Sequence, residues 1–441
     1  MIKLLLVTAL LAAPADSSAE SNQAPTVISL EKALEIALSE SPSVKVADKE
    51  IETKKFAKKG SYAALFPEIS ATGTFNRTLK KQVMSMDFGG VSQSFEVGRW
   101  NTWSGGLNAQ MPLVNAQLWK SLKISGEDVE LAVEKARSSR LETVNQVKQA
   151  YYGVLLAKEA NKVYKDVYDN AVANCELTEK KYNVSRASEL DLARAKTAVA
   201  NAVPNLYDSD NAIALALWQL KAVMGIGLDE NIDVADSLLC YGGGLEYKAG
   251  DLSLENNSTM RQLELQAEQI AASIKVQQYA NLPSLALAFS YSYNAMEDDF
   301  QFKQYDWFPY SYVALSLNIP IFAGGKRHSA VKQAKLQAES LDIQRENTER
   351  QLKIAISQYL STMETASKSF TTANEALELA QKAYDISAKS YEVGRSTLTD
   401  LNDAQLALTQ AKLGVSQAVY NFIVAKAGLE STIGADFSSE K

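Results

Sequence analysis

The sequence predicts an α+β membrane protein in which two copies of one unit, each about 210 residues long, combine short strands with very long helices. Three observations predict this class. A 68-residue stretch, 326–393, contains neither glycine nor proline. Four other segments carry apolar residues at every second position, which is the period of a β-strand. The third observation is a repeat at a spacing of 209 residues.

Composition and charge limit the classes of protein. The chain has 441 residues, 46% of them apolar, and a net charge of −7 without a basic cluster, which argues against nucleic acid as a partner. The two cysteines, Cys175 and Cys240, could pair in an oxidising compartment. Alternatively, Cys175 is a small buried hydrophobe, because it falls on a helix packing stripe.

The N-terminus has the pattern of a secretory signal. Lys3 precedes an apolar run over 4–13, and Ser17 and Ala19 provide small residues for cleavage, with Ala13 and Ala15 as a second option. We expect a signal peptide at 1–19. The apolar run is too short to span a bilayer. The sequence therefore predicts an exported protein without a transmembrane helix.

The predicted elements follow the same order in both copies. The first copy, 29–224, contains helix 29–65, strands 68–79 and 101–113, long helix 117–184 and helix 188–224, which Pro204 should interrupt and kink. A linker, 225–254, follows. The second copy, 255–433, contains helix 255–282, strands 284–294 and 310–321, long helix 326–393 and helix 397–433, with a tail at 434–441.

The second long helix shows two packing stripes, and the first long helix repeats the register of one of them. Residues spaced alternately by three and four run from Ile356 to Tyr391, and a second stripe runs from Ala376 to Val393. Such heptad seams are typical of coiled packing, and two seams indicate two neighbours. We therefore expect a layer or closed ring of helices, in which two shorter helices placed end to end match one long helix.

The four alternating segments are candidates for membrane strands. Their polar positions carry hydroxyls, amides and small residues without charge, and their length of about ten residues suits a tilted membrane strand. Aromatic residues gather near the far ends, as in an interfacial belt. A soluble antiparallel sheet with one wet face is the alternative, but the signal peptide and the aromatic ends favour the membrane.

Four strands cannot close a barrel, and open sheet edges are not tolerated in lipid. The chain must therefore oligomerise if its strands span a membrane. A dimer would give eight strands and a filled interior, whereas a trimer would give twelve strands and room for a pore.

Several motifs in this order resemble the TolC-like outer membrane efflux family. They include "SLEKALEIALSESPSV" near the start, "LFPEISATGTF" and "NLPSLALAFSYSY" leading into strands, and "YEVGRSTLTDLNDA" after the second long helix. The resemblance implies a homotrimer whose 12-stranded outer-membrane barrel continues into a periplasmic helical tunnel. It also implies an exit duct without enzymatic activity. The implied partners are a periplasmic adaptor and an inner-membrane transporter.

Two turns between helices, around 185 and 394, are the candidate functional site. Ser188 with Asp191 and Thr397 with Asp400 match the capping box at a helix start. The resemblance implies a gate at the periplasmic end, formed by Asp400, Asp403, Arg194, Arg186 and Arg395. It also implies adaptor contacts at Val184, Ser185, Val393 and Gly394.

Other chemistry finds no support in the sequence. The single histidine, His328, lacks the clustered ligands of a metal site, and "FAGGKR" lacks the pattern of a phosphate loop. No catalytic constellation and no cofactor site is predicted. The alternative function is a periplasmic coiled-coil scaffold or adaptor without a pore. Small-molecule efflux and protein secretion remain equally open.

Overall fold

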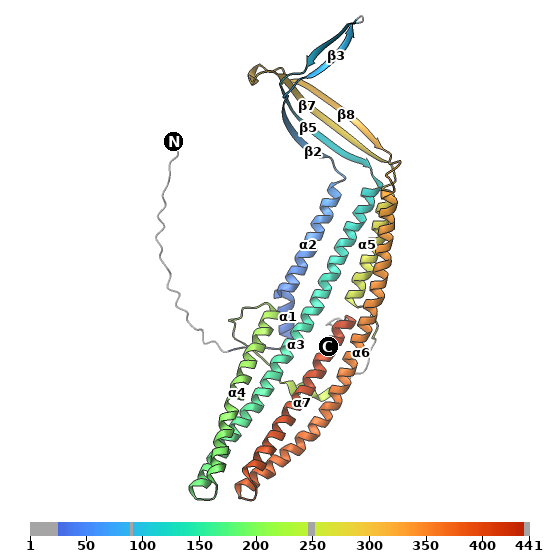
Figure 1. Cartoon of the computed structure of the whole chain (residues 1–441). Helices are drawn as coiled ribbons and strands as arrows, with labels where there is room; N and C mark the ends of the chain where they lie inside the picture. Colours follow the sequence, from blue (N-terminus) through green and yellow to red (C-terminus); the bar gives the residue numbers. More distant parts are fainter. Residues whose placement is uncertain (1–24, 89–90, 246–251, 436–441) are drawn as a thin grey trace, which may run out of the picture.

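The computed structural model describes residues 25–88, 91–245 and 252–435. The predicted signal 1–19 lies outside these ranges, as do parts of the linker 225–254 and of the tail 434–441. The molecule is a long, narrow array of helices with a small β-sheet at one end and two turns that connect helices at the other (Figure 1). The predicted α+β class is confirmed.

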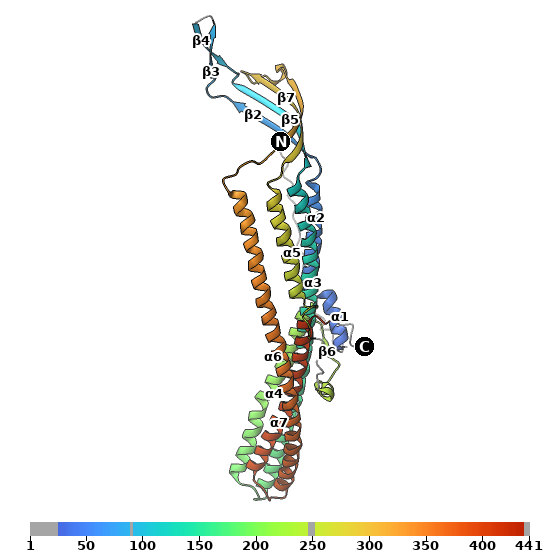
Figure 2. The same cartoon turned by 90° about the vertical axis from the view of Figure 1, so that its right-hand side faces the viewer.

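The helices form two corresponding sets. The first set is α1 (Leu30–Glu40), α2 (Pro42–Ala63), α3 (Ala116–Asn183) and α4 (Glu189–Met224), and the second is α5 (Ser258–Tyr279), α6 (Lys326–Glu392) and α7 (Leu398–Ile433). The long helices α3 and α6 contain 68 and 67 residues, and α4 and α7 contain 36 each. Figures 1 and 2 show α2 and α4 following one another along α3, and α5 and α7 following one another beside α6.

The expectation of a single helix over 29–65 was wrong. Ser41 takes an extended conformation (φ −54°, ψ 129°) between α1 and α2. The residue before a proline is pushed out of the helical region, and proline fits the first position of a new helix. Pro42 therefore ends α1 and begins α2.

The expected interruption at Pro204 was also wrong. The helix α4 continues through Pro204 from Glu189 to Met224. Inside a helix, proline removes one hydrogen bond and crowds the carbonyl group four residues earlier, at a cost of about 3 kcal/mol. Because α4 packs along α3, side-chain contacts hold it together on both sides of this position.

One antiparallel sheet contains strands from both copies. It consists of β2 (Glu68–Arg77), β5 (Asn101–Val114), β7 (Ser284–Glu297) and β8 (Phe308–Asn318), in the order β2-β5-β7-β8. β8 starts two residues earlier and ends three residues earlier than the expected strand 310–321. Pro320, which has no amide hydrogen for a strand ladder, lies just beyond this end.

Several short elements were not predicted. β3 (Gln82–Phe88) and β4 (Val91–Val97) form a hairpin beyond the main sheet (Figure 2). In the linker, β6 (Ile232–Val234) pairs in parallel with β1 (Thr26–Ile28), and the 3₁₀ helix η1 (Leu238–Gly244) follows. Strands of three residues are too short to give a periodic signal.

The largest hydrophobic core lies at mid-length, where the linker meets α1, α3, α4, α6 and α7. Tyr151, Leu220 and Met363 are fully buried there. Tyr151 donates a hydrogen bond of 2.8 Å to Asp236 of the linker, and Tyr241 donates one of 3.3 Å to the same carboxylate. Burial raises the pKa of Tyr241 to about 12, so both phenols stay protonated and anchor the linker.

Candidate functional site

The sheet has two chemically different faces. Ile69, Ala109, Phe289 and Val313 lie side by side on what we call the apolar face. Ser70, Asn108, Ser290 and Tyr312 form a row on the polar face. Ser290 donates to the Asn108 side chain at 2.8 Å, and Asn108 donates to Thr72 at 3.1 Å. The polar face is therefore joined by hydrogen bonds between side chains.

The apolar face lies open to its surroundings. Val313, Leu315 and Leu317 of β8 are 60–70% exposed. A soluble monomer rarely exposes a contiguous apolar surface of this kind. An apolar outer face with alternating polar residues on the other side is the pattern of a membrane β-strand.

Among the residues that the structure describes, no strand pairs with either edge of the sheet. β2 pairs only with β5, and β8 pairs only with β7. In a membrane such edges need partner strands. A further copy of the chain could supply them by placing its β2 beside β8.

The helical layer also ends in free faces. α6 forms one border of the layer, and Ile343, Leu379 and Ile386 on it are 57–70% exposed. Leu379 and Ile386 belong to the second stripe that the sequence indicates on this helix. At the other border, Tyr207 and Trp218 of α4 are also exposed.

The expected single aromatic belt was wrong for part of its residues. Trp103 contacts Phe75 at 4.1 Å and Phe302 at 4.7 Å between ring centroids, on the apolar face. Tyr291 and Tyr293 also lie on that face. The register places Phe308, Tyr310 and Tyr312 on the polar face instead.

The two turns at the far end share one backbone design. Arg186 N–H donates to Lys181 C=O, and Arg395 N–H donates to Ser390 C=O, each at 2.8 Å. Hydrogen bonds from Ser185 N–H to Tyr182 C=O at 2.9 Å and from Gly394 N–H to Tyr391 C=O at 3.1 Å complete both turns. This is the Schellman arrangement, which needs one residue in the left-handed region.

Ser185 and Gly394 occupy these left-handed positions, with φ of 59° and 78°. Ser185 is the one non-glycine residue with positive φ among the residues that the structure describes. A side chain there costs backbone energy that glycine avoids. The first turn therefore keeps its shape despite a less suitable residue.

The helices that leave the turns begin with complete capping boxes. Ser188 Oγ accepts from Asp191 N–H at 3.1 Å, and Thr397 Oγ1 accepts from Asp400 N–H at 3.2 Å. The aspartates reciprocate, and Thr397 N–H donates to Asp400 at 2.9 Å. This backbone hydrogen bond, followed by the one from the Thr397 hydroxyl, lowers the pKa of Asp400.

The remaining residues expected at the gate are exposed. The turns place Arg186, Arg395, Val184 and Val393 at the end of the molecule, and Arg194 and Asp403 lie on the second turns of α4 and α7. In the part of the chain that the structure describes, no ion pair joins one of these arginines to Asp400 or Asp403.

The sequence did not predict a link between the two helical hairpins, α3–α4 and α6–α7. The hydroxyls of Thr178 on α3 and Tyr391 on α6 lie 2.6 Å apart. The Lys181 ammonium donates a hydrogen bond to the Tyr391 carbonyl, and its nitrogen lies 4.0 Å from the centre of the tyrosine ring. Burial lowers the pKa of Lys181, which a smaller effect of Glu392 opposes.

The heptad seam explains why this link was missed. Thr178 and Tyr391 fit the seams as packing residues, and the cross-hairpin register that brings them together is invisible in one sequence. Tyr391 is buried with Leu398, Leu401 and Ala195. Further along the same interface, Asn170 donates to Gln405 at 3.3 Å, and Lys412 forms an ion pair with Asp166 at 2.8 Å.

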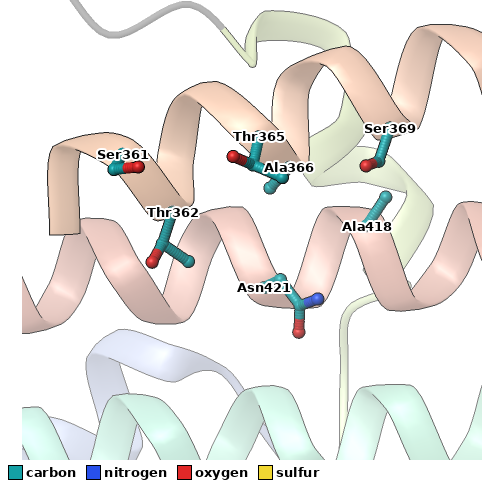
Figure 3. Close-up of a pocket in the computed structure, with 7 residues that line it drawn as sticks. All are labelled: Ser361, Thr362, Thr365, Ala366, Ser369, Ala418 and Asn421. Atoms are coloured by element: carbon teal, nitrogen blue, oxygen red, sulfur yellow. The ribbon is translucent and has the colours of Figure 1, made fainter. Parts of the chain in front are cut away.

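A groove of about 220 Å³ lies between α6 and α7, and hydroxyl groups dominate its lining (Figure 3). Its lining residues are Ser361, Thr362, Thr365, Ala366, Ser369, Ala418 and Asn421. The lining contains no carboxylate, amine, thiol or imidazole. Within the described residues, no group of three or more His, Cys, Asp or Glu side chains could hold a metal ion.

Neither cysteine forms a disulfide. Cys175 and Cys240 are free; Cys175 is half-buried against the cluster of Ala195, Tyr391, Leu398 and Leu401, and Cys240 is exposed. Across residues 25–88, 91–245 and 252–435, no helix combines the length and the hydrophobicity needed to cross a membrane.

Solved structures of outer membrane channels share this fold. The chain aligns with the outer membrane channel CmeC of Campylobacter jejuni at a TM-score of 0.74 and 18% identity, covering 100% of this chain and 96% of that one. The open state of the Neisseria gonorrhoeae channel MtrE gives 0.72 and 20%, covering 92% and 88%. The outer membrane protein VceC of Vibrio cholerae gives 0.72 and 16%, covering 92% and 96%.

A family model described as outer membrane efflux protein matches residues 33–226 and 249–435. The match includes both helical hairpins, all four strands of the main sheet and both turns. The members of this family are transport channels. The chain belongs to the outer membrane efflux protein family.

Proposed function

We propose that the protein is the outer-membrane exit duct of an export system. The observation that carries this proposal is the four-stranded sheet, which has an exposed apolar face, a hydrogen-bonded polar face and two unpaired edges. This sheet continues into a layer of helices that ends in two matched turns. A passive wall of this kind needs no catalytic group.

Closure of the wall requires further copies of the chain. A trimer, the assembly that the family resemblance implies, joins β8 of each chain to β2 of the next and gives twelve strands. The same rotation brings the free face of α6 against α2 and α4 of the neighbour. Burial of exposed side chains such as Leu379, Ile386 and Trp218 would stabilise this contact, because each large apolar side chain contributes about 1.5–3 kcal/mol when fully buried.

The six turns of the trimer form the periplasmic mouth in this proposal. Asp400 on the first turn of α7 and Asp403 on the second are both exposed. Three copies of this pair would create a negative potential at the entrance and favour cations. The lowered pKa of Asp400 keeps its carboxylate charged at neutral pH.

The exposed turns are also where we place the adaptor. Val184 and Val393 present isolated apolar side chains beside Arg186 and Arg395. A periplasmic adaptor protein would bind this mixed surface and connect the duct to an inner-membrane transporter. In this arrangement the sheet lies in the outer membrane and the helices cross the periplasm.

Planar lipid bilayers test the duct and its gate together. Protein purified in detergent is added to the bilayer as wild type and as Asp400→Ala/Asp403→Ala. We expect a small wild-type conductance that increases in the double variant, together with a loss of cation preference.

The control removes the same charges at the same spacing elsewhere. Glu339 and Asp342 are exposed on α6, far from the turns. Glu339→Ala/Asp342→Ala should conduct like the wild type. Equal conductance in all three proteins would remove the acidic gate but keep the pore. A protein that needs no detergent and never inserts would instead support the scaffold without a pore.

A further inference from the structure

Three aromatic residues interrupt the polar face of the sheet. Phe308, Tyr310 and Tyr312, which we call the aromatic ladder, alternate along β8 with apolar-face residues such as Val313. We propose that the ladder is a binding strip on the inner wall of the barrel for planar aromatic cations. This inference rests on the proposed duct, because only barrel closure turns the polar face into a lumen.

The register fixes the direction of the ladder. Tyr312 lies opposite Ser290, Tyr310 lies opposite Ser292, and Phe308 lies opposite Asn294. Residues on one face of a strand alternate with those of the other face. Because Val313, Leu315 and Leu317 occupy the lipid side, the three rings belong to the water-filled side.

The rings are open rather than packed. Phe308, Tyr310 and Tyr312 are 66%, 59% and 44% exposed. Their neighbours on β7 are two serines and one asparagine, which are too short to cover an aromatic ring. The centroids of Tyr310 and Tyr312 are 5.8 Å apart, with their planes at 45°. A planar solute can therefore lie against one ring while its edge meets the next.

The absence of lysine and arginine from the polar face favours a solute with a positive charge. The polar face of β2, β5, β7 and β8 carries no lysine or arginine, and its one charged residue is Glu68. Aromatic faces attract cations, most strongly where no other positive charge competes. A flat ring system with a positive charge thus gains both stacking and cation–π attraction, whereas a compact alkylammonium ion gains only the second.

The test measures the binding of proflavine, a planar aromatic cation, by fluorescence anisotropy with the full-length protein in detergent. We expect Tyr310→Ser/Tyr312→Ser to weaken binding about tenfold, as the loss of two ring contacts predicts. Serine already occupies the facing positions on β7, so the strand tolerates it.

The matched control is Tyr291→Ser/Tyr293→Ser. These two tyrosines form the same alternate-residue pair on β7 but lie on the apolar face. This control should bind proflavine like the wild type. Equal weakening in both double variants would overturn the proposal, and so would unchanged binding in the ladder variant.

Two measurements separate this proposal from the duct itself. The oligomer mass and the bilayer conductance of the same preparations test the duct. A conducting trimer that binds proflavine without need of the ladder would refute only the binding strip. Displacement of proflavine by tetraethylammonium at equal concentration would also refute it, because charge alone would then explain the binding.

Discussion

The link between Thr178, Lys181 and Tyr391 predicts how firmly the mouth is closed. It joins α3 of the first hairpin to α6 of the second, less than two turns from both helix ends. If the hairpins separate when the duct opens, these contacts break. Weakening them should therefore shift the equilibrium toward the open state.

The structure gives a magnitude for Tyr391→Phe. This change removes the 2.6 Å contact with Thr178, while Thr178 can still donate to Asn174 C=O at 2.7 Å. The loss of one such hydrogen bond costs about 1 kcal/mol. Three protomers that open together would lose about 3 kcal/mol, a shift of roughly 100-fold in the closed-to-open ratio.

Lys181→Met should act more strongly. It removes a charge-assisted hydrogen bond to the Tyr391 carbonyl and the cation–π contact with the ring. Together these contribute about 2 kcal/mol per protomer at a half-buried site. Methionine keeps most of the aliphatic stem, so packing against α6 changes little.

Single-channel recording in planar bilayers measures this effect as open probability. Tyr384→Phe is the control, because Tyr384 packs against the same cluster on α6 and makes no hydrogen bond described for it. It should behave like the wild type. If Tyr391→Phe and Lys181→Met also keep the wild-type open probability, the hairpins do not separate at this link, and the reasoning fails.

Two further predictions concern the turns. Ser185→Gly should raise the free energy of unfolding by about 0.5–1 kcal/mol and Gly394→Ser should lower it by a similar amount, because both positions have positive φ. Thermal denaturation measures both changes. A destabilised Ser185→Gly or a stabilised Gly394→Ser would contradict the strain argument. Asp400 should stabilise the start of α7 above about pH 3.9, the unfolded value, and lose this effect as the pH falls through its lowered folded pKa. Amide exchange in that turn should therefore differ between wild type and Asp400→Asn at about pH 7, and the difference should disappear once the pH is below the folded pKa of Asp400. A difference that persists in strong acid would show that the charge is not responsible.

Local patterns in the sequence predict most of the helices and strands. The seam from Ile356 to Tyr391 and the freedom from glycine and proline predict α6 to within one residue at its end. Alternation likewise predicts β5 and β7. Side chains within a few residues of one another decide these elements, so one sequence contains the information.

Two of the errors come from contacts between distant segments. Pro204 remains inside α4 because α3 supports that helix from another part of the chain. A gathering of aromatic residues does not by itself show which strand face each occupies, and the register with β7 places the ladder on the polar face. The link at Tyr391 depends on the relative register of α3 and α6, which no periodicity encodes.

The duplication leads to a last prediction about the two joints at the mouth. Tyr182 is the counterpart of Tyr391 at a spacing of 209 residues, but it is 39% exposed, whereas Tyr391 is 6% exposed. The counterpart of Lys181 is Ser390, which cannot supply a positive charge. In a closed ring, Tyr391 faces its own chain, and Tyr182 lies near the border that meets the next chain.

The joint within each chain should therefore be stronger than the joint between chains. Tyr182→Phe should change the open probability much less than Tyr391→Phe, because it breaks no hydrogen bond described within the chain. Recording both variants under the same conditions decides the matter. Equal opening by the two would mean that each tyrosine bonds across its joint, and that the ring, unlike the single chain, keeps the symmetry of the duplicated sequence.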